Sequence, residues 1–250
     1  HHFNDEKFST SNPYAELLAH VTARTAKLIA QWQSVGFCHG VMNTDNMSIL
    51  GLTLDYGPFQ FLDGFNPQLI CNHSDHQGRY AYGRQAQVAY WNLFCLAQAL
   101  MPLIDDQDLA VKALETYKKV FSENWSQCFL AKLGLQVQED EAAALEDQTL
   151  LNDGLEILAK EQVDFSIFWR KLSHAASKTD ASSLEWQAVA DLFIDQSAWV
   201  GWRDRYLSRL QSKPSEAAVK KMISINPKYV LRNHLAEAAI QKSKLGDHSE

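Results

Sequence analysis

Three side chains in the segment 39–59 carry oxygen atoms that could bind a metal ion or accept a proton, namely Asp45, Asn46 and Asp55. A carboxylate and an amide together suit Mg²⁺, which prefers a few protein oxygens combined with phosphate oxygens and water. Asn46 and Asp55 are therefore predicted to hold a divalent cation. Asp45 could face an incoming substrate instead and accept its proton. Because Asp and Asn also favour tight turns, a turn without chemistry is the alternative interpretation.

Two short strands are the elements predicted to position these oxygens. The apolar stretches Met47–Leu50 and Leu52–Leu54 flank Gly51, which is typical of a small β-hairpin around a tight turn. Such a hairpin would place Asn46, at the start of one strand, beside Asp55, at the end of the next. The oxygens of the two side chains would then converge.

The order of these groups is similar to that in kinases. There, a helix leads into a loop that begins with His and contains a catalytic Asp and a metal-binding Asn, and a hairpin then ends in Asp-Phe-Gly. Here His39 begins the loop, and the last triplet is Asp55-Tyr56-Gly57. The loop departs from the kinase order because Val41 stands where the catalytic Asp is expected. This departure argues against an ordinary protein kinase.

Five strings of residues carry a more specific resemblance. They are His-Gly-Val-Met-Asn-Thr-Asp-Asn-Met-Ser from His39, Leu-Asp-Tyr-Gly-Pro-Phe from Leu54, Cys-Asn-His-Ser-Asp from Cys71, Gly-Arg-Tyr-Ala-Tyr from Gly78, and Asn-Pro-Lys-Tyr-Val-Leu-Arg-Asn from Asn226. With these strings the chain resembles, over nearly its whole length, the selenoprotein O family of pseudokinase-like protein adenylyltransferases.

The resemblance implies an enzyme that transfers AMP from ATP to Ser, Thr or Tyr hydroxyls of target proteins, with ATP bound in an orientation reversed from that in ordinary kinases. By motif, Asp45 would be the catalytic proton acceptor. Asn46 and Asp55 would hold Mg²⁺ or Mn²⁺, and Asp55 would also reach the nucleotide through the metal. The family's glycine-rich loop and phosphate-binding residues belong to an N-terminal lobe that would precede His1. We therefore expect this chain alone to be inactive.

The rest of the sequence predicts a mostly α fold. Asn12 and Pro13 predict the start of a first helix that ends near Ser34. Residues 62–84 predict a long ordered loop, which is usually functional, and a helix starts near Arg84. Further helices are expected through the stripe of Ala110, Leu114, Tyr117, Phe121 and Trp125, and around 139–160, 164–177, 184–210 and 227–243.

The predicted architecture is a protein kinase-like C-lobe with one small β-hairpin that carries the metal site, followed by a C-terminal helical extension. Residues 1–104 are predicted to form the C-lobe core. Residues 105–250 are predicted to form a helical region packed on that core.

Composition limits the partners and the compartment. The formal net charge of -7 argues against a protein that binds nucleic acid through phosphate contacts. The apolar run Trp91–Ile104 is too short to cross a bilayer and predicts a buried helix, so no membrane partner is expected. No secretory signal opens the chain, and the four cysteines form no CxxC pair. We expect a bacterial cytoplasm, or a mitochondrion for a eukaryotic member of the family.

Several interpretations stay open beside the adenylyltransferase. The group His73, Asp75 and His76 could bind zinc, although ordering of the loop is the simpler role. His39 is expected to anchor the catalytic loop, not to act as a base. At the level of function, the alternatives are a phosphotransferase of the antibiotic- or choline-kinase type and a non-catalytic pseudokinase module that presents the 62–84 loop to a partner.

Overall fold

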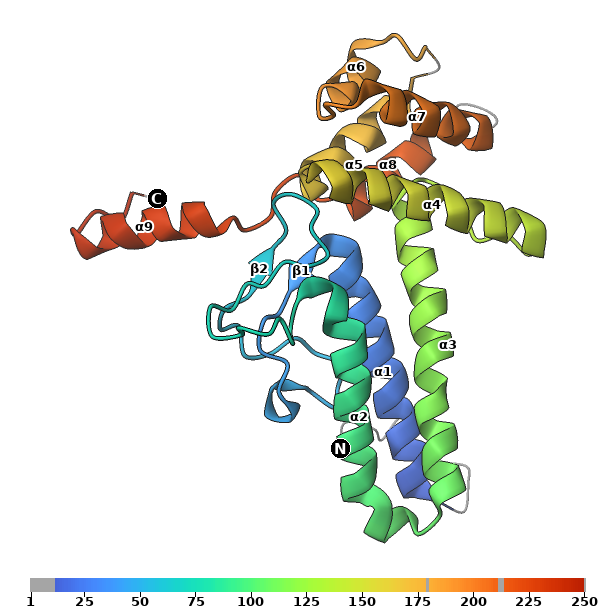
Figure 1. Cartoon of the computed structure of the whole chain (residues 1–250), viewed down its shortest axis with the longest axis vertical. Coiled ribbons are helices and arrows are strands. Elements are labelled where there is room, and N and C mark those ends of the chain that lie inside the picture. Colours follow the sequence, from blue (N-terminus) through green and yellow to red (C-terminus); the bar gives the residue numbers. More distant parts are fainter. Residues whose placement is uncertain (1–11, 179, 211–213, 250) are drawn as a thin grey trace. The chain divides into compact units, whose positions relative to one another are not determined.

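The structure, a computed structural model, describes residues 12–178, 180–210 and 214–249 and is mostly helical (Figure 1). The α-helices are α1 (Pro13–Val35), α2 (Gln85–Ile104), α3 (Gln107–Lys132), α4 (Glu141–Glu161), α5 (Phe165–Ala175), α6 (Leu184–Ala190), α7 (Gln196–Leu210), α8 (Glu216–Ile225) and α9 (Asn233–Lys244). The strands are β1 (Phe37–Cys38) and β2 (Gln60–Phe61), and the 3₁₀ helices are η1 (Thr44–Asn46) and η2 (Tyr82–Arg84).

The chain divides into two compact units. The first comprises the residues up to Ser34 together with Cys38–Phe59 and Gln68–Cys128, and the second comprises Val35–Phe37, Gln60–Pro67 and the residues from Phe129 on. All three predicted site residues belong to the first unit. The predicted division between residues 1–104 and 105–250 stays a prediction.

The first unit is built on α1, α2 and the greater part of α3, which run side by side (Figure 1). The predicted start of α1 is confirmed, since the Asn12 side chain accepts a hydrogen bond from the Ala15 amide at 3.1 Å. The same side chain donates to the Ile104 carbonyl at 2.7 Å, which ties the start of α1 to the end of α2. The Tyr117 hydroxyl of α3 donates to the Ala86 carbonyl of α2 at 2.8 Å. These bonds fix the helices that flank the loop 38–59.

The predicted hairpin is the main correction to the fold. Residues 47–54 form a turn at Gly51, which has a φ of +67°, but neither flank is a strand. Leu52 and Leu54 are exposed, and two isolated strands of this length are at best marginally stable in water. The small sheet instead pairs β1 with β2, so its strands lie before and after the site segment and do not carry it.

The second unit holds α4–α9 and an aromatic core. The Phe168 ring of α5 lies 5.0 Å from that of Trp169 and 5.9 Å from that of Phe193, measured between centroids. The single helix expected at 184–210 is two helices, because Asp195 interrupts it and accepts hydrogen bonds from the Ser197 and Ala198 amides at the start of α7.

The helix expected at 227–243 is also different in the structure. Asn226, the residue before the expected helix, follows α8 and is fully buried. Its side-chain amide donates to the Lys132 carbonyl at 3.1 Å and to the Ser173 hydroxyl at 2.8 Å. The helix α9 begins only at Asn233, and none of its residues is buried.

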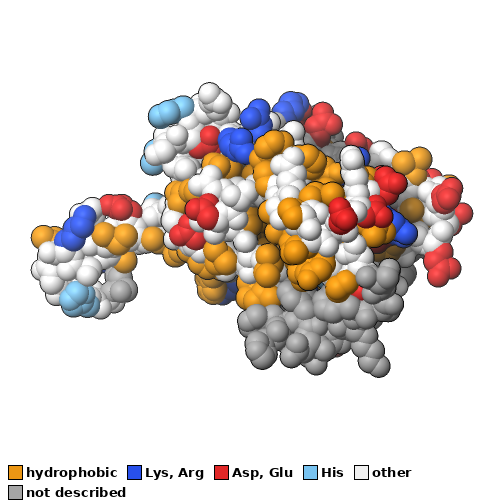
Figure 2. All heavy atoms as spheres, turned by 90° about the horizontal axis from the view of Figure 1, so that it is seen from below, with side chains coloured by type: hydrophobic (Ala, Val, Ile, Leu, Met, Phe, Trp, Pro, Cys, Tyr) orange, Lys and Arg blue, Asp and Glu red, His pale blue; other side chains and the backbone are white. Residues whose placement is uncertain are grey.

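Helix α2 is more exposed than the sequence predicts. Trp91 and Phe94 are exposed and stack on one another, with ring centroids 6.0 Å apart. The stretch Tyr82–Ile104 is long and apolar enough, by length and composition, to cross a membrane, although core helices meet the same criteria. On the face shown in Figure 2, hydrophobic side chains cover much of the surface, and Lys and Arg form small groups beside acidic residues.

Candidate functional site

The catalytic-loop candidates Asp45 and Asn46 lie together in the short helix η1. The Asp45 side chain is exposed, whereas Asn46 is half-buried. The Asn46 side-chain amide donates to the Val41 carbonyl at 3.0 Å, and the Asn46 backbone amide donates to the Asn43 carbonyl at the same distance. These two bonds hold the Asn46 side chain against the loop, and the oxygen of its amide stays available as a ligand atom.

Asp55 lies in a tight turn with an unusual backbone conformation. Its φ is +57°, in the left-handed region that Asp and Asn tolerate better than other residues with a side chain. The Gly57 amide donates to the Asp55 carbonyl at 2.8 Å, which closes the turn. The Asp55 side chain is exposed, so its carboxylate is accessible to a ligand.

One buried histidine joins the two segments. The His39 Nε2 atom lies 2.8 Å from the carbonyl oxygen of Leu54, the residue before Asp55. The His39 Nδ1 atom accepts a hydrogen bond from the Val41 amide at 3.3 Å. With Nδ1 as an acceptor, Nε2 carries the proton and donates to Leu54. The Val41 carbonyl in turn holds Asn46, so His39 and Val41 connect the two predicted metal ligands through hydrogen bonds.

Helix α1 supports the same histidine through Trp32. The Trp32 and His39 rings are stacked, with centroids 5.3 Å apart. The Trp32 Nε1 atom donates to the Thr53 hydroxyl at 2.8 Å, two residues before Asp55. The sequence offers no local signal for this role of Trp32, so sequence analysis missed it.

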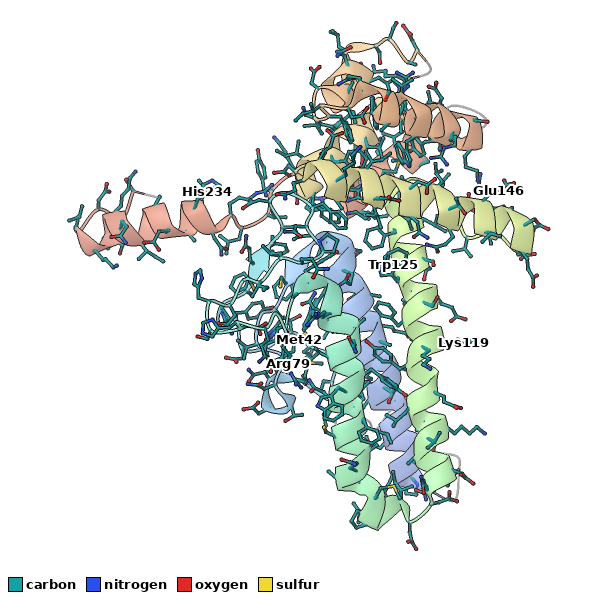
Figure 3. All side chains as sticks on the ribbon, viewed as in Figure 1. Met42, Arg79, Lys119, Trp125, Glu146 and His234 are labelled. Carbon is teal, nitrogen blue, oxygen red and sulfur yellow. The ribbon has the colours of Figure 1, made fainter. Side chains whose placement is uncertain are left out.

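The 62–84 loop packs against the predicted catalytic loop, residues 39–46. The Asn72 side chain donates to the Gly40 carbonyl at 3.2 Å, and the Tyr80 hydroxyl donates to the side-chain oxygen of Asn43. The two oxygens of Asp75 accept from the Arg79 and Tyr80 amides at 2.9 and 2.7 Å. Figure 3 shows Arg79 on this loop, on the same side of α2 as Met42. Asp75 therefore orders the loop that lies over the catalytic segment.

Comparison with known proteins identifies the family. All 250 residues match the family described as protein adenylyltransferase SelO. The chain belongs to the SelO family. It is 58% identical over 245 residues to the protein nucleotidyltransferase YdiU of Albidiferax ferrireducens, covering 98% of this chain and 48% of that protein. It is 47% identical over 251 residues to the protein of the same name from Aliivibrio salmonicida, covering 100% of this chain and 49% of that protein.

This SelO family member thus spans about half the length of the curated relatives that it matches. The relatives' shared name describes nucleotidyl transfer to proteins, which agrees with the resemblance drawn from the motifs. The match includes the segment with Asp45, Asn46 and Asp55, because it extends over nearly the whole chain. The roles of these three residues stay predictions.

The predicted donor set of Asn46 and Asp55 would suit a hard cation that completes its coordination with substrate phosphates. Among the described residues, no group of three or more His, Cys, Asp or Glu side chains is placed to hold a metal ion. One exposed carboxylate, from Asp55, and one restrained amide, from Asn46, are too few ligands for a structural zinc site. They fit Mg²⁺ or Mn²⁺, because such ions keep several waters and complete their shell with substrate phosphates.

Two cysteines of the SelO chain meet beside the catalytic loop. The sulfur atoms of Cys38 and Cys71 lie 3.4 Å apart, and both thiols are free. The hydrogen bond with Cys71, together with burial, raises the pKa of the Cys38 thiol far above its usual range. The same hydrogen bond lowers the pKa of Cys71, because it stabilises the Cys71 thiolate. Cys71 is therefore the more reactive member of the pair.

Alkylation is expected to distinguish the two thiols. Only the thiolate reacts, so a lowered pKa makes Cys71 react faster than Cys38 near neutral pH. Cys38→Ala removes the hydrogen bond that stabilises the Cys71 thiolate, and the alkylation of Cys71 should then need a higher pH. Iodoacetamide labelling over a pH series, read by peptide mass spectrometry, measures both effects. Equal labelling of Cys71 in the parent and in Cys38→Ala would contradict this assignment.

Proposed function

We propose that this chain is the catalytic-loop-bearing part of a protein adenylyltransferase, which transfers AMP from ATP to Ser, Thr or Tyr hydroxyls of target proteins. The first unit then corresponds to a kinase-like C-lobe, completed by an N-terminal lobe that grips the nucleotide. The expected setting is a bacterial cytoplasm, with ATP and protein substrates as partners. Nucleic acid and membranes are not expected to be partners.

The observation that carries this proposal is the double role of His39. Its buried ring bonds the backbone next to Asp55 and the backbone that holds Asn46. A donor set divided between two segments needs such a connection, because a metal site loses affinity when its ligands move independently. The connection through His39 supports a shared site at these two segments over a turn without chemistry.

The residues divide the chemistry between them. Asp45, which is exposed beside Asn46, would accept the proton of the attacking hydroxyl. Asn46 and Asp55 would hold Mg²⁺ or Mn²⁺, and Asp55 would reach the nucleotide phosphates through it. When bound, the cation neutralises charge that develops on the phosphates. Asn43, held by Tyr80, keeps the 62–84 loop in contact with this segment, where a protein substrate would approach.

The position of a label tests the reaction. The test uses the extended protein, which we define as this chain together with the N-terminal lobe that the resemblance implies. It is incubated with ATP labelled at the α- or the γ-phosphate, in Mg²⁺ or Mn²⁺. Protein-bound α-label is expected. Bound γ-label would instead support a phosphotransferase, and no label from a folded protein would support the non-catalytic interaction module.

A further inference from the structure

Two buried amide side chains of α2 hold the backbone of the catalytic loop. The Gln85 side-chain oxygen accepts a hydrogen bond from the His39 backbone amide at 2.9 Å. The Asn92 side-chain amide donates to the Met42 carbonyl at 2.9 Å. Both bonds are buried, and Gln85 is fully inaccessible to solvent. Figure 3 shows Met42 beside α2.

The spacing of Gln85 and Asn92 explains why the single helix α2 binds both ends of the segment 39–42. Gln85 and Asn92 are seven positions apart, which is about two helical turns, so they lie on the same face of α2. Residues 39–42 belong to no helix or strand, and strand β1 ends just before them at Cys38. Their buried backbone groups therefore need partners from side chains, since an unpaired buried amide or carbonyl is unfavourable. Helix α2 supplies one acceptor and one donor.

Residues 39–42, which lie between the bonds from Gln85 and Asn92, are linked to the predicted site residues Asn46 and Asp45. The amide of Val41 donates to the His39 ring, and its carbonyl accepts the Asn46 side-chain amide. Asp45 follows Met42 by three residues. A displacement of residues 39–42 would therefore reach both the predicted metal ligand and the predicted proton acceptor.

We propose that Gln85 and Asn92 are positioning residues of the transfer reaction, which together fix the register of residues 39–42 and through it the places of Asn46 and Asp45. Neither residue touches a reacting atom. The part of this proposal that concerns catalysis rests on the proposed function, whereas the part that concerns loop order does not.

The opposite hydrogen-bonding roles of the two amides allow a matched design. Gln85→Glu keeps the acceptor oxygen, and Gln85→Met removes it at similar size. Asn92→Asp keeps the size and removes the donor. If the two residues only fill space, Gln85→Glu and Asn92→Asp should behave alike. If they hold the loop as proposed, Gln85→Glu should lose less loop order than Gln85→Met, because it keeps the acceptor oxygen although it buries an acid. Asn92→Asp should resemble Gln85→Met. Gln98→Met is the control, because Gln98 is an exposed glutamine on the same helix.

Amide hydrogen exchange in the extended protein is the first measurement, because it needs no nucleotide. In Gln85→Met and Asn92→Asp, exchange in peptides that cover residues 39–47 is expected to be about tenfold faster, since each variant leaves a buried backbone group unpaired. Peptides from α1 and the Gln98→Met control should be unchanged. Unchanged exchange in residues 39–47 of folded variants would overturn the proposal, whether or not the protein transfers AMP.

Kinetics with α-labelled ATP complete the test. Gln85→Met and Asn92→Asp are expected to lower kcat about 10- to 100-fold, as found for residues that support metal ligands, with little change in the KM for ATP. Gln85→Glu, which keeps the acceptor oxygen, should keep a higher kcat than Gln85→Met. A parent protein that transfers no label refutes the proposed function, whereas a parent and a Gln85→Met variant of equal kcat refute the positioning role. If Gln85→Met and Asn92→Asp lowered only the thermal stability and kept the parental kcat, the positioning role would also be refuted.

Discussion

Asp55→Ala is expected to abolish Mn²⁺ binding by the extended protein and to lower AMP transfer at least 100-fold, about the upper range found even for residues that only support metal ligands. Asp55 contributes the single carboxylate of the predicted ligand pair, and the neutral amide of Asn46 cannot replace its charge. The side chain is exposed, so any loss of stability should come from the backbone conformation of the turn and not from lost packing. Electron paramagnetic resonance of bound Mn²⁺ and transfer of α-label measure the two effects.

The left-handed backbone conformation of Asp55 makes a second variant necessary as a control. Alanine is less stable than aspartate at a φ of +57°, because the left-handed conformation costs about 1–2 kcal/mol. Part of any loss of Mn²⁺ binding in Asp55→Ala could therefore come from a changed turn. Asp55→Asn tolerates this conformation and keeps one oxygen while it removes the charge. Weak Mn²⁺ binding by both variants would assign the loss to the carboxylate. Parental Mn²⁺ binding by Asp55→Asn and Asp55→Ala would refute the metal site.

The start of the first helix was predictable because its signals are local. Asn12 can cap only the residues that follow it, and Pro13 is compatible only with the first turn, so both constrain α1 without help from the rest of the chain. The end near Ser34 was also predicted closely, because Gly36 follows with a φ of +72°. Where capping residues and hydrophobic periodicity agree, as they do for α1, the bounds of a helix depend little on tertiary contacts.

The hairpin prediction failed because contacts distant in sequence decide the conformation of that segment. The Leu54 carbonyl bonds to His39 and the Thr53 hydroxyl to Trp32, so two residues of the expected second strand are held by other parts of the chain. No local pattern around Gly51 contains these partners. The roles predicted for Asp45, Asn46 and Asp55 rest on residue type and order and not on the hairpin, so they stay predictions.

The supporting residues show a further limit of sequence reasoning. Asn92 was visible only as a polar interruption of an apolar run, and Gln98 interrupts the same run, yet one is buried against the catalytic loop and the other is exposed. Spacing from Gln85 could have distinguished them, since position 92 shares a helical face with position 85 and position 98 does not. That comparison requires knowing which face of α2 meets the loop, and only the structure supplies it.

Asp45→Asn is expected to lower kcat for AMP transfer about 10²- to 10⁴-fold, the usual contribution of a general base, while Mn²⁺ binding stays close to that of the parent. The carboxamide keeps the size of the side chain and its place in η1, but it cannot accept the hydroxyl proton. Asp45 is exposed, so the variant should fold normally. The comparison with Asp55→Asn is the sharpest control, because the two carboxylates differ in predicted role.

The pair of variants separates the two steps of the proposed chemistry. Loss of both Mn²⁺ binding and transfer in Asp55→Asn, beside loss of transfer alone in Asp45→Asn, would assign the metal to one carboxylate and the proton to the other. If Asp45→Asn also lost Mn²⁺, Asp45 would be a metal ligand, and the hydroxyl would lose its proton to another group. If Asp45→Asn transferred AMP at the parental rate, the base assignment would be wrong although the metal site could stand.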